Sequence, residues 1–266
     1  MKRRDFISRS ALATGAFTIL PGHVLAGNGK LSFNDRINLG FIGVGKQSIG
    51  LMRSITGCPE TMVLAACDVD SKKLARFKEQ AEKANAEKLN GGSQEVDTYE
   101  NYRELLERKD IDAVVIVAPD HWHAMMAVDA AKAGKDIYCE KPMALTVEEG
   151  RAMVHAARKY NRVFQTGNMQ RSWRNFRHAC EMVSNGYIGE VTEVNVNVGD
   201  PVRACELPAQ PVPDYLNWNL WVGPSMFRAY HKDLSPPIEY RGWPQWRRYR
   251  DFGGGSITDW GAHMFD

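Results

Sequence analysis

The sequence of 266 residues has little cysteine and no large excess of either charge. Its cysteines are odd in number, and none stands at Cys-x-x-Cys or at another spacing typical of zinc ligands. The formal net charge of +2 includes a basic surplus near the N-terminus, so the rest lacks the basic character of a nucleic-acid-binding protein. We therefore expect free, mostly buried thiols and no nucleic-acid partner. The five cysteines are Cys58, Cys67, Cys139, Cys180 and Cys205.

The sequence also lacks an apolar run long enough to cross a membrane, which takes roughly 18 residues. Its N-terminal apolar stretch, residues 11–20, is shorter, follows the pair Arg3-Arg4, and precedes a cleavage-like Val-Leu-Ala triplet at 24–26. This pattern predicts a twin-arginine signal and short linker over residues 1–30, read by the twin-arginine export machinery. The protein is then periplasmic or extracytoplasmic, is exported folded, and has no membrane span in its mature form. A short N-terminal helix with a chance arginine pair is the alternative.

Internal repeats and low-complexity tracts are absent, and apolar segments alternate with helical patterns from residue 37 onward. Short apolar segments with the composition of buried strands occur at 37–42, 62–68, 113–117 and 136–139. Strands that alternate with helices at this spacing are typical of a parallel, doubly wound sheet. The sequence therefore predicts an α/β fold whose residues 31–165 form a NAD(P)-binding Rossmann domain.

The pattern changes after residue 165. Residues 191–198 alternate strictly between apolar and polar side chains, which predicts an antiparallel strand with one face in water. Residues 199–250 are rich in Pro, Trp and Arg with little periodicity, which suits a long loop over a pocket. Residues 166–266 are therefore expected to form an incomplete α+β domain with a largely antiparallel open sheet, the N-terminal part of a substrate domain.

A glycine-rich turn follows the first predicted strand and begins a helix. Its glycines permit a tight turn and let a pyrophosphate approach backbone N–H groups at the helix N-terminus. Asp68 ends the second strand, where a carboxylate can accept hydrogen bonds from the adenosine ribose and repel a 2′-phosphate. We predict NAD as cofactor, with NADP less favoured; a glycine-rich turn in an unrelated α/β protein is the alternative. Asp70 is predicted to cap the next helix. The predicted cofactor contacts here are Gly43, Gly45, Lys46, Gln47 and Asp68.

Two further segments follow later strands, at the edge where a doubly wound sheet binds ligands. These are Ala118-Pro119-Asp120-His121-Trp122-His123 and Cys139-Glu140-Lys141-Pro142. A buried lysine beside a nicotinamide can orient a substrate hydroxyl or stabilise a developing alkoxide. Asp120 is predicted to be a helix cap, and the two histidines fit either loop packing or cofactor contact. The predicted cofactor contacts here are Ala118, Pro119, His123, Glu140 and Lys141.

Two more candidates stand at the end of the sequence, after the run Gly253-Gly-Gly255. Asp259 and His263 are four residues apart, so on a helix they share one face. A neutral imidazole, whose ordinary pKa is about 6.5, can take a hydroxyl proton while hydride leaves for the nicotinamide. Asp259 can hold a sugar hydroxyl or tune the histidine. Spacing marks no third ligand, so a metal site is not predicted.

Together these motifs resemble the Gfo/Idh/MocA family of oxidoreductases. The resemblance runs from about residue 35 to the end and is carried by Gly43-x-Gly45, Cys67-Asp68-Val69-Asp70, Ala118-Pro119-Asp120-x-x-His123 and, most specifically, Glu140-Lys141-Pro142. It implies a catalytic set of Lys141, Asp259 and His263, a second domain with an open sheet, and a homo-oligomer in the full-length form. Relatives continue beyond the Asp-x-x-x-His motif, so we expect a C-terminal truncation that leaves the second part with few paired strands.

The resemblance also suggests weaker candidates for substrate contact. Asn168, Gln170 and Arg171 correspond to the family region that crosses from cofactor to substrate. In the Pro-rich stretch, Trp246 and Arg247 are retained as weak candidates. Trp243 and Trp260 can also stack on sugars, but aromatic residues in such a stretch are as often packed against the core.

These features predict an NAD-dependent oxidoreductase that transfers a hydride between nicotinamide and a secondary hydroxyl of a sugar, cyclitol or glycoside. Free NAD is scarce outside the cytoplasm, so an exported enzyme is expected to carry its cofactor tightly bound. One alternative is an NAD-dependent glycosidase that oxidises its sugar transiently and eliminates the glycosidic bond. The resemblance implies that such members replace the lysine found here at Lys141. The other alternative is a catalytically idle NAD-binding protein with a structural or sensing role.

Overall fold

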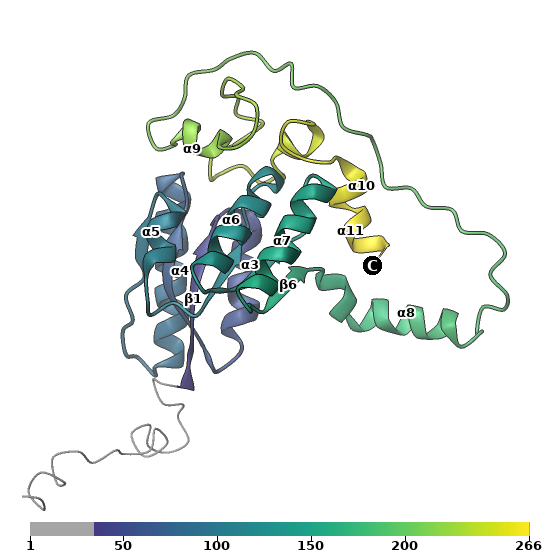
Figure 1. Ribbon diagram of the computed structural model, residues 1–266, viewed down its shortest axis with the longest axis horizontal. Helices are drawn as coiled ribbons and strands as arrows, with labels where there is room; N and C mark the ends of the chain where they lie inside the picture. Colours follow the sequence, from purple (N-terminus) through teal and green to yellow (C-terminus); the bar gives the residue numbers. More distant parts are fainter. Residues whose placement is uncertain (1–34, 266) are drawn as a thin grey trace, which may run out of the picture.

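The computed structural model describes residues 35–265. The predicted twin-arginine signal, its cleavage-like triplet and the linker up to residue 30 lie outside the described residues. The chain forms a layered α/β unit, and its C-terminal residues lie over one edge of that unit (Figure 1). Between residues 35 and 265, no helix combines the length and the apolar composition that crossing a membrane requires.

A six-stranded parallel sheet forms the centre of the α/β unit, as the sequence predicts. Its strands are β1 (Ile37–Ile42), β2 (Thr61–Cys67), β3 (Asp97–Tyr99), β4 (Ala113–Ile116), β5 (Asp136–Glu140) and β6 (Phe164–Gly167). The strand order is β3-β2-β1-β4-β5-β6, so the direction of winding reverses between β1 and β4. Every residue of β2 is buried, as expected for a strand covered on both faces. By contrast, β3 has three residues, none of them buried, and no apolar pattern that would predict it.

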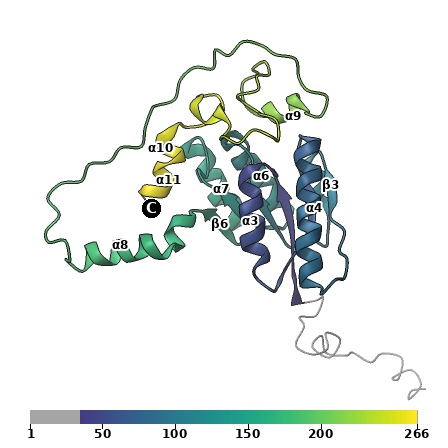
Figure 2. The ribbon, with the colours of Figure 1, turned by 180° about the vertical axis from the view of Figure 1, so that it is seen from behind.

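Helices cover both faces of the sheet (Figures 1 and 2). They are α3 (Lys46–Thr56), α4 (Ser71–Lys88), α5 (Tyr102–Glu107), α6 (Asp120–Lys132) and α7 (Val147–Lys159). Helices α3 and α4 enclose one apolar core around Phe41 and Phe77. Helices α5, α6 and α7 enclose a second core, which includes Leu105, Ala127 and Met153. The sheet is thus fixed from both sides, and its edges are available to position loops.

Local sequence signals begin and end these helices where expected. Asp70 accepts hydrogen bonds from the backbone N–H groups of Lys72 and Lys73, which confirms it as the cap of α4. Thr146 and Glu149 form the predicted capping box at the start of α7. Gly134 follows α6 with a φ of +79°, the left-handed conformation that glycine adopts readily after a helix.

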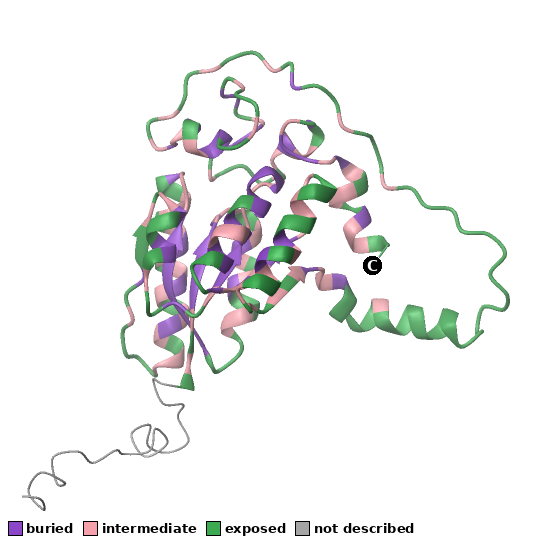
Figure 3. Cartoon of the chain, in the orientation of Figure 1, coloured by how far each residue is buried: buried purple, intermediate pink, exposed green. Residues whose placement is uncertain are grey.

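The chain after β6 is less regular. It contains η2 (Met169–Ser172), α8 (Arg174–Ser184), α9 (Trp218–Val222), η3 (Gln245–Arg248), α10 (Ser256–Asp259) and α11 (Gly261–Met264). Long irregular stretches and few strand pairings were expected here: within residues 168–265 the pairing is limited to two isolated bridges. Helix α8 has no buried residue, and the segment after it is largely exposed (Figure 3).

The strand predicted for residues 191–198 is wrong. This segment is irregular and largely exposed, and it pairs with no other part of the described chain. Alternating side chains favour a strand only when a neighbouring backbone supplies hydrogen-bond partners. Within residues 35–265 no backbone pairs with this segment, and its apolar residues, such as Val194, remain exposed.

A small aromatic cluster joins the C-terminal part to the sheet unit. The rings of Trp218 and Trp221 stack with centroids 4.6 Å apart, and Phe252 packs against Trp221. Backbone bonds fix the cluster to the end of β2: the Asn217 N–H donates to the Val69 carbonyl over 2.9 Å. The C-terminal residues are thereby held above the carboxyl edge of the sheet.

Candidate active site

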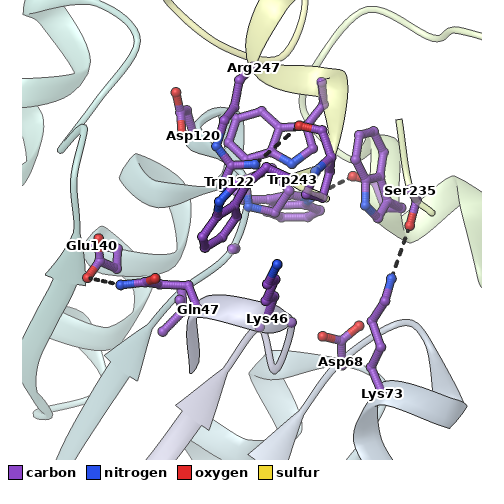
Figure 4. A pocket seen from close by; sticks show the side chains of 18 of the residues that line it. Lys46, Gln47, Asp68, Lys73, Asp120, Trp122, Glu140, Ser235, Trp243 and Arg247 are labelled. Atoms are coloured by element: carbon purple, nitrogen blue, oxygen red, sulfur yellow. Dashed lines mark hydrogen bonds between the residues drawn. The ribbon is translucent and has the colours of Figure 1, made fainter. Parts of the chain in front are cut away.

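A pocket of about 710 Å³ lies at this carboxyl edge, next to the reversal of strand order. Its floor comes from the loops that follow β1, β2, β4 and β5, and its roof comes from residues 234–263 (Figure 4). A ligand in it therefore contacts both parts of the chain. This is the position where an open α/β sheet binds ligands.

The turn after β1 has the geometry of a phosphate-binding loop. Gly43 has a φ of +83°, and a Cβ atom there would lie 2.7 Å from the Ala118 nitrogen, so only glycine fits. A Cβ atom on Gly45 would meet nothing within 4 Å, which leaves open space at the N-terminus of α3. Ser48 takes the place of a third glycine; it is buried, and its hydroxyl donates to the Gly45 carbonyl over 2.8 Å. The free N–H groups of this helix end can receive a pyrophosphate.

Asp68 lies at the end of β2, as predicted. Its carboxylate accepts the N–H groups of Val44 at 2.7 Å and of Asp70 at 2.9 Å, and so ties the glycine turn to β2. Burial raises its pKa, while the nearby Lys73 acts in the opposite direction. Each oxygen has a further lone pair, so the carboxylate retains the capacity to accept ribose hydroxyls.

Two other predicted cofactor residues lie at the start of α3. The Lys46 ammonium donates to the Arg241 carbonyl and lies 4.9 Å from the centre of the Trp243 ring. Gln47 donates to Glu140, with 3.5 Å between Nε2 and Oε1 (Figure 4). Lys46 thus connects the phosphate-binding turn with the roof.

The loop after β4 contributes Ala118 and Pro119, two of the predicted cofactor contacts, to the pocket. His123 does not line the pocket; its two ring nitrogens lie 2.7 Å from the Pro142 carbonyl and 2.8 Å from the Ala118 carbonyl. The prediction of a direct cofactor contact by His123 is corrected to loop packing. This side chain holds the loops after β4 and β5 together.

Asp120 is not the cap of α6 that the sequence predicts. The cap of α6 is Pro119, and Asp120 is the first helical residue, with 3% of its surface exposed. It lines the pocket beside Arg247 (Figure 4). Burial raises the pKa of its carboxyl well above the ordinary value; Asp259 adds to this rise, and Arg247 opposes it. Asp120 is thus a buried acid of the site.

Lys141 and Asp259, far apart in the sequence, meet in the pocket. The Lys141 ammonium lies 2.5 Å from Asp259 Oδ1 and donates to the Asp259 carbonyl over 2.8 Å. Here the predicted helix is interrupted at Trp260, between α10 and α11, and the His263 N–H bonds to the Trp260 carbonyl. Lys141 therefore donates to the Asp259 carbonyl, which does not accept the His263 N–H.

His263 lines the same pocket. Its Nδ1 atom is buried without a hydrogen-bond partner, which leaves Nε2 as the nitrogen available to a ligand. Burial lowers its pKa below the ordinary value, and the positive charge of Lys141 lowers it further, while Asp259 opposes the shift. The imidazole is therefore neutral near pH 7, the form that can accept a proton.

Arg247 is a third charged partner of this group. Its Nε atom lies 3.6 Å from Asp259 Oδ1, and its guanidinium lies 4.2 Å from the centre of the Trp246 ring. Burial lowers its pKa, and the carboxylates of Asp259 and Asp120 oppose that shift. Trp246 itself is only 6% exposed and belongs to the aromatic cluster, so it supports Arg247 more than it offers a surface to a ligand.

The three candidate substrate contacts after β6 lie in different surroundings. Asn168 donates to the Ala262 carbonyl over 3.1 Å and so fixes α11, and Gln170 lines the pocket. Arg171 is exposed and does not line the pocket, which corrects its assignment as a substrate contact. In residues 35–265, no group of three or more His, Cys, Asp or Glu side chains is arranged to hold a metal ion.

The structure adds pocket residues that the sequence did not single out. Lys73 pairs with Asp70 at 2.9 Å and donates to the Ser235 hydroxyl at 3.4 Å, so it links α4 to the roof. No sequence signal marks Ser235, because its position depends on how residues 199–250 fold. The five cysteines are free, and Cys67, Cys139 and Cys205 are buried, as expected.

Comparisons with known proteins agree with this fold. Residues 37–168 match the family model described as an oxidoreductase family with NAD-binding Rossmann fold, and residues 187–266 match an oxidoreductase family C-terminal alpha/beta domain. A glycosyl hydrolase family 109 protein of Stenotrophomonas maltophilia is 28% identical over 215 residues, covering 79% of this chain and 46% of that protein. A myo-inositol 2-dehydrogenase of Thermotoga maritima is 28% identical over 180 residues, covering 68% and 48%.

Solved structures give the same result. Myo-inositol 2-dehydrogenase from Lactobacillus plantarum matches with a TM-score of 0.51 at 30% identity, over 59% of this chain and 43% of that one. KijD10, a 3-ketoreductase from Actinomadura kijaniata in complex with TDP-benzene and NADP, matches with a TM-score of 0.50 at 28% identity, over 58% and 45%. The chain spans less than half the length of these relatives.

Proposed function

Because the chain belongs to the Gfo/Idh/MocA family of oxidoreductases, we propose that it transfers a hydride between NAD and a secondary hydroxyl of a sugar, cyclitol or glycoside. The observation that carries the proposal is the meeting of Lys141 with Asp259, 2.5 Å apart, beside His263 in one pocket. An ammonium, a carboxylate and a neutral imidazole there can bind a hydroxyl and take its proton.

The residues present fit a dinucleotide. Gly43 and Gly45 leave room for phosphates at the N-terminus of α3, and Asp68 lines the same pocket, where its carboxylate would accept the adenosine ribose hydroxyls. When bound, the nicotinamide ring accepts or donates the hydride. We favour NAD over NADP because the Asp68 carboxylate repels a 2′-phosphate, although the KijD10 relative is in complex with NADP. The roof contacts of Lys46 support a tightly held cofactor.

In the oxidising direction, Nε2 of His263 would accept the proton of the substrate hydroxyl as the hydride leaves the carbon that carries this hydroxyl, so that a ketone remains. Lys141 donates a hydrogen bond to the substrate oxygen and stabilises the charge that develops on it. Asp259 fixes the lysine and accepts a bond from a neighbouring hydroxyl. In the reducing direction, His263 would return this proton to the oxygen of the ketone.

An elimination glycosidase is the second candidate, favoured by the glycosyl hydrolase family 109 relatives. It uses the same cofactor and also begins with oxidation of the sugar. The family resemblance associates that chemistry with loss of the lysine at position 141, which this chain retains. Release of an aglycone from a glycoside without net reduction of NAD distinguishes it from a dehydrogenase.

Residues 1–30 support a further proposal, export by the twin-arginine route to the periplasm. The support is the Arg3-Arg4 pair before an apolar stretch. Export in the folded state lets the cofactor travel bound. Replacement of both arginines by lysine, followed by fractionation of cells, tests this: the variant should remain in the cytoplasm.

The central experiment uses protein purified from the cytoplasm. Mass spectrometry of the nucleotide released on denaturation should identify NAD, and a set of polyols, sugars and glycosides should yield the absorbance of reduced nicotinamide with at least one member. A protein that holds no nucleotide contradicts the cofactor assignment. A protein that holds NAD but oxidises or reduces no member of the set favours the idle NAD-binding alternative.

A further inference from the structure

Two tryptophans at the mouth of the pocket differ from the others. Trp243 is 47% exposed and Trp260 is 54% exposed, and both line the pocket. The remaining tryptophans of the pocket are buried in the fold; the Trp122 indole N–H, for example, donates to the Trp221 carbonyl over 2.9 Å. Burial in the core therefore explains the other pocket tryptophans but not these two.

Trp260 stands beside the proposed catalytic groups. It follows Asp259 directly, and its backbone N–H donates to the Ser256 carbonyl over 2.8 Å, which fixes its place at the end of α10. Its ring centre lies 6.3 Å from that of His263, with an angle of 69° between the planes. His263 is the ring that packs against this indole. More than half of the Trp260 surface remains exposed, and the residue lines the pocket.

The charges deeper in the pocket are engaged with one another. Asp259 bridges Lys141 and Arg247 at 2.5 Å and 3.6 Å. A ring that binds farther out, at the mouth, meets an indole face in place of an unpaired charge. The C–H face of a pyranose is apolar and its rim is neutral, so it is suited to contact with an aromatic face.

We propose, on the basis of the function above, that Trp260 is a stacking platform for a neutral sugar ring next to the ring that is oxidised. The substrate is then a glycoside of at least two rings. The reacting ring is held by Lys141, Asp259 and His263, and the second ring lies on the indole. Export makes such a neutral glycoside directly accessible.

Trp243 has a different role. The Lys46 ammonium and the Arg247 guanidinium lie 4.9 Å and 5.3 Å from the centre of its ring, so its faces are occupied by cations. Lys46 begins α3 at the phosphate-binding turn. We assign Trp243 to the cover of the cofactor, which makes it the contrasting variant to Trp260.

The test measures binding of maltose, cellobiose, lactose and N,N′-diacetylchitobiose, and of their monosaccharides, to the NAD-loaded protein by calorimetry. At least one disaccharide should bind about tenfold more tightly than its monosaccharide, which corresponds to about 1.4 kcal/mol and lies within the range of aromatic contacts. Trp260→Ala should abolish that difference and Trp260→Phe should keep most of it. Trp243→Ala should release nucleotide instead. Trp173→Ala, half-exposed on the surface outside the pocket, is the unchanged control.

Binding separates this inference from the proposed function. If no disaccharide binds more tightly than its monosaccharide, or if the preference survives in Trp260→Ala with nucleotide retained, the platform is refuted. If the preference depends on Trp260 but no hydride transfer occurs, the platform stands and the dehydrogenase assignment fails. Retained nucleotide and an unchanged circular dichroism spectrum show that the Trp260 variants are folded.

Discussion

The residues before and after position 167 are held in place by different means. Up to Gly167, parallel strands bury apolar residues on both faces, and two cores lock five helices onto them. After it, the described chain forms no sheet of its own and depends on one aromatic cluster and a few bonds to the sheet edge. The first part is therefore a rigid frame, and the second is a cover whose accuracy depends on its attachment.

The two parts nevertheless share the proposed catalytic group. Lys141 follows β5 of the frame, whereas Asp259 and His263 come from the cover. Their geometry is correct only when the cover is attached. Different substitutions should therefore affect turnover, the attachment of the cover and the choice of cofactor separately.

The largest effect should follow from removing one proposed catalytic group from either part. We expect Lys141→Ala and His263→Ala each to lower turnover by about a hundredfold or more, because an oriented donor or base is lost, while nucleotide stays bound. Turnover and released nucleotide are measured together. Lys109→Ala, exposed and outside the pocket, should behave as the parent protein. Full activity in either variant would show that the site is misplaced.

The attachment itself can be broken at Gly223, where a Cβ atom would lie 2.0 Å from the Trp122 ring. We expect Gly223→Ala to destabilise the cover by about 3 kcal/mol or more, through overpacking added to its positive φ. Gly91→Ala is the matched control, because Gly91 also has a positive φ but its Cβ atom would meet nothing within 4 Å. Hydrogen exchange in residues 168–265 should rise in the first variant alone. Equal rises in both would argue against a close-packed attachment.

A pH titration of stability tests the same attachment, where His121 contacts the aromatic cluster. His121 Nε2 lies 3.1 Å from the Trp221 carbonyl, and burial lowers the pKa of this histidine to about 4. The unfolded chain binds the proton near pH 6.5, so His121 should stabilise the fold above that pH by up to about 3 kcal/mol and lose this contribution as the pH falls toward 4.

His121→Gln, which keeps a donor but cannot titrate, should flatten this loss. The measurement is the free energy of unfolding in urea at pH 7.5 and pH 4.5 for both proteins. Other titrating groups, including Asp120 with its raised pKa and opposite sign, are common to the pair and cancel in the difference. Parallel pH profiles would remove His121 from the explanation.

The smallest effect should come from Asp68, a residue of the frame, and should concern cofactor affinity alone. Asp68→Ala should weaken NAD binding by about tenfold and relax discrimination against NADP, because an acceptor and a like charge are lost. Asp68→Asn keeps an acceptor without the charge, so it should retain more NAD affinity while still accepting NADP. Unchanged NAD affinity in Asp68→Ala would contradict the ribose assignment.

The frame could be predicted from the sequence because its signals are local. Strands buried on both faces appear as apolar runs, and helices begin at residues such as Asp70 and Thr146 that cap their own backbone. The glycine turn and Asp68 were placed correctly because each directly follows a recognisable strand. The same logic brought Lys141 to the correct edge of the sheet.

The cover could not be predicted in this way, because its geometry depends on distant contacts. Asp120 has the sequence of a helix cap but becomes a buried acid, since Arg247 and Asp259 are folded over it. The alternation at 191–198 is a sound strand pattern without a partner. Sequence also could not separate Trp246, which is buried, from Trp260, which is open to the pocket.

The hydrogen bond that Asn168 donates to the Ala262 carbonyl leaves part of the chain free to vary. It anchors the turn that carries His263 to the end of β6, next to the lysine that follows β5. The segment between residues 185 and 198, which is largely exposed and pairs with no other part of the described chain, can then lengthen, shorten or change sequence without displacing either group. Substrate specificity can therefore change while Lys141 and His263 keep their relative positions. The same reaction could then be applied to different substrates.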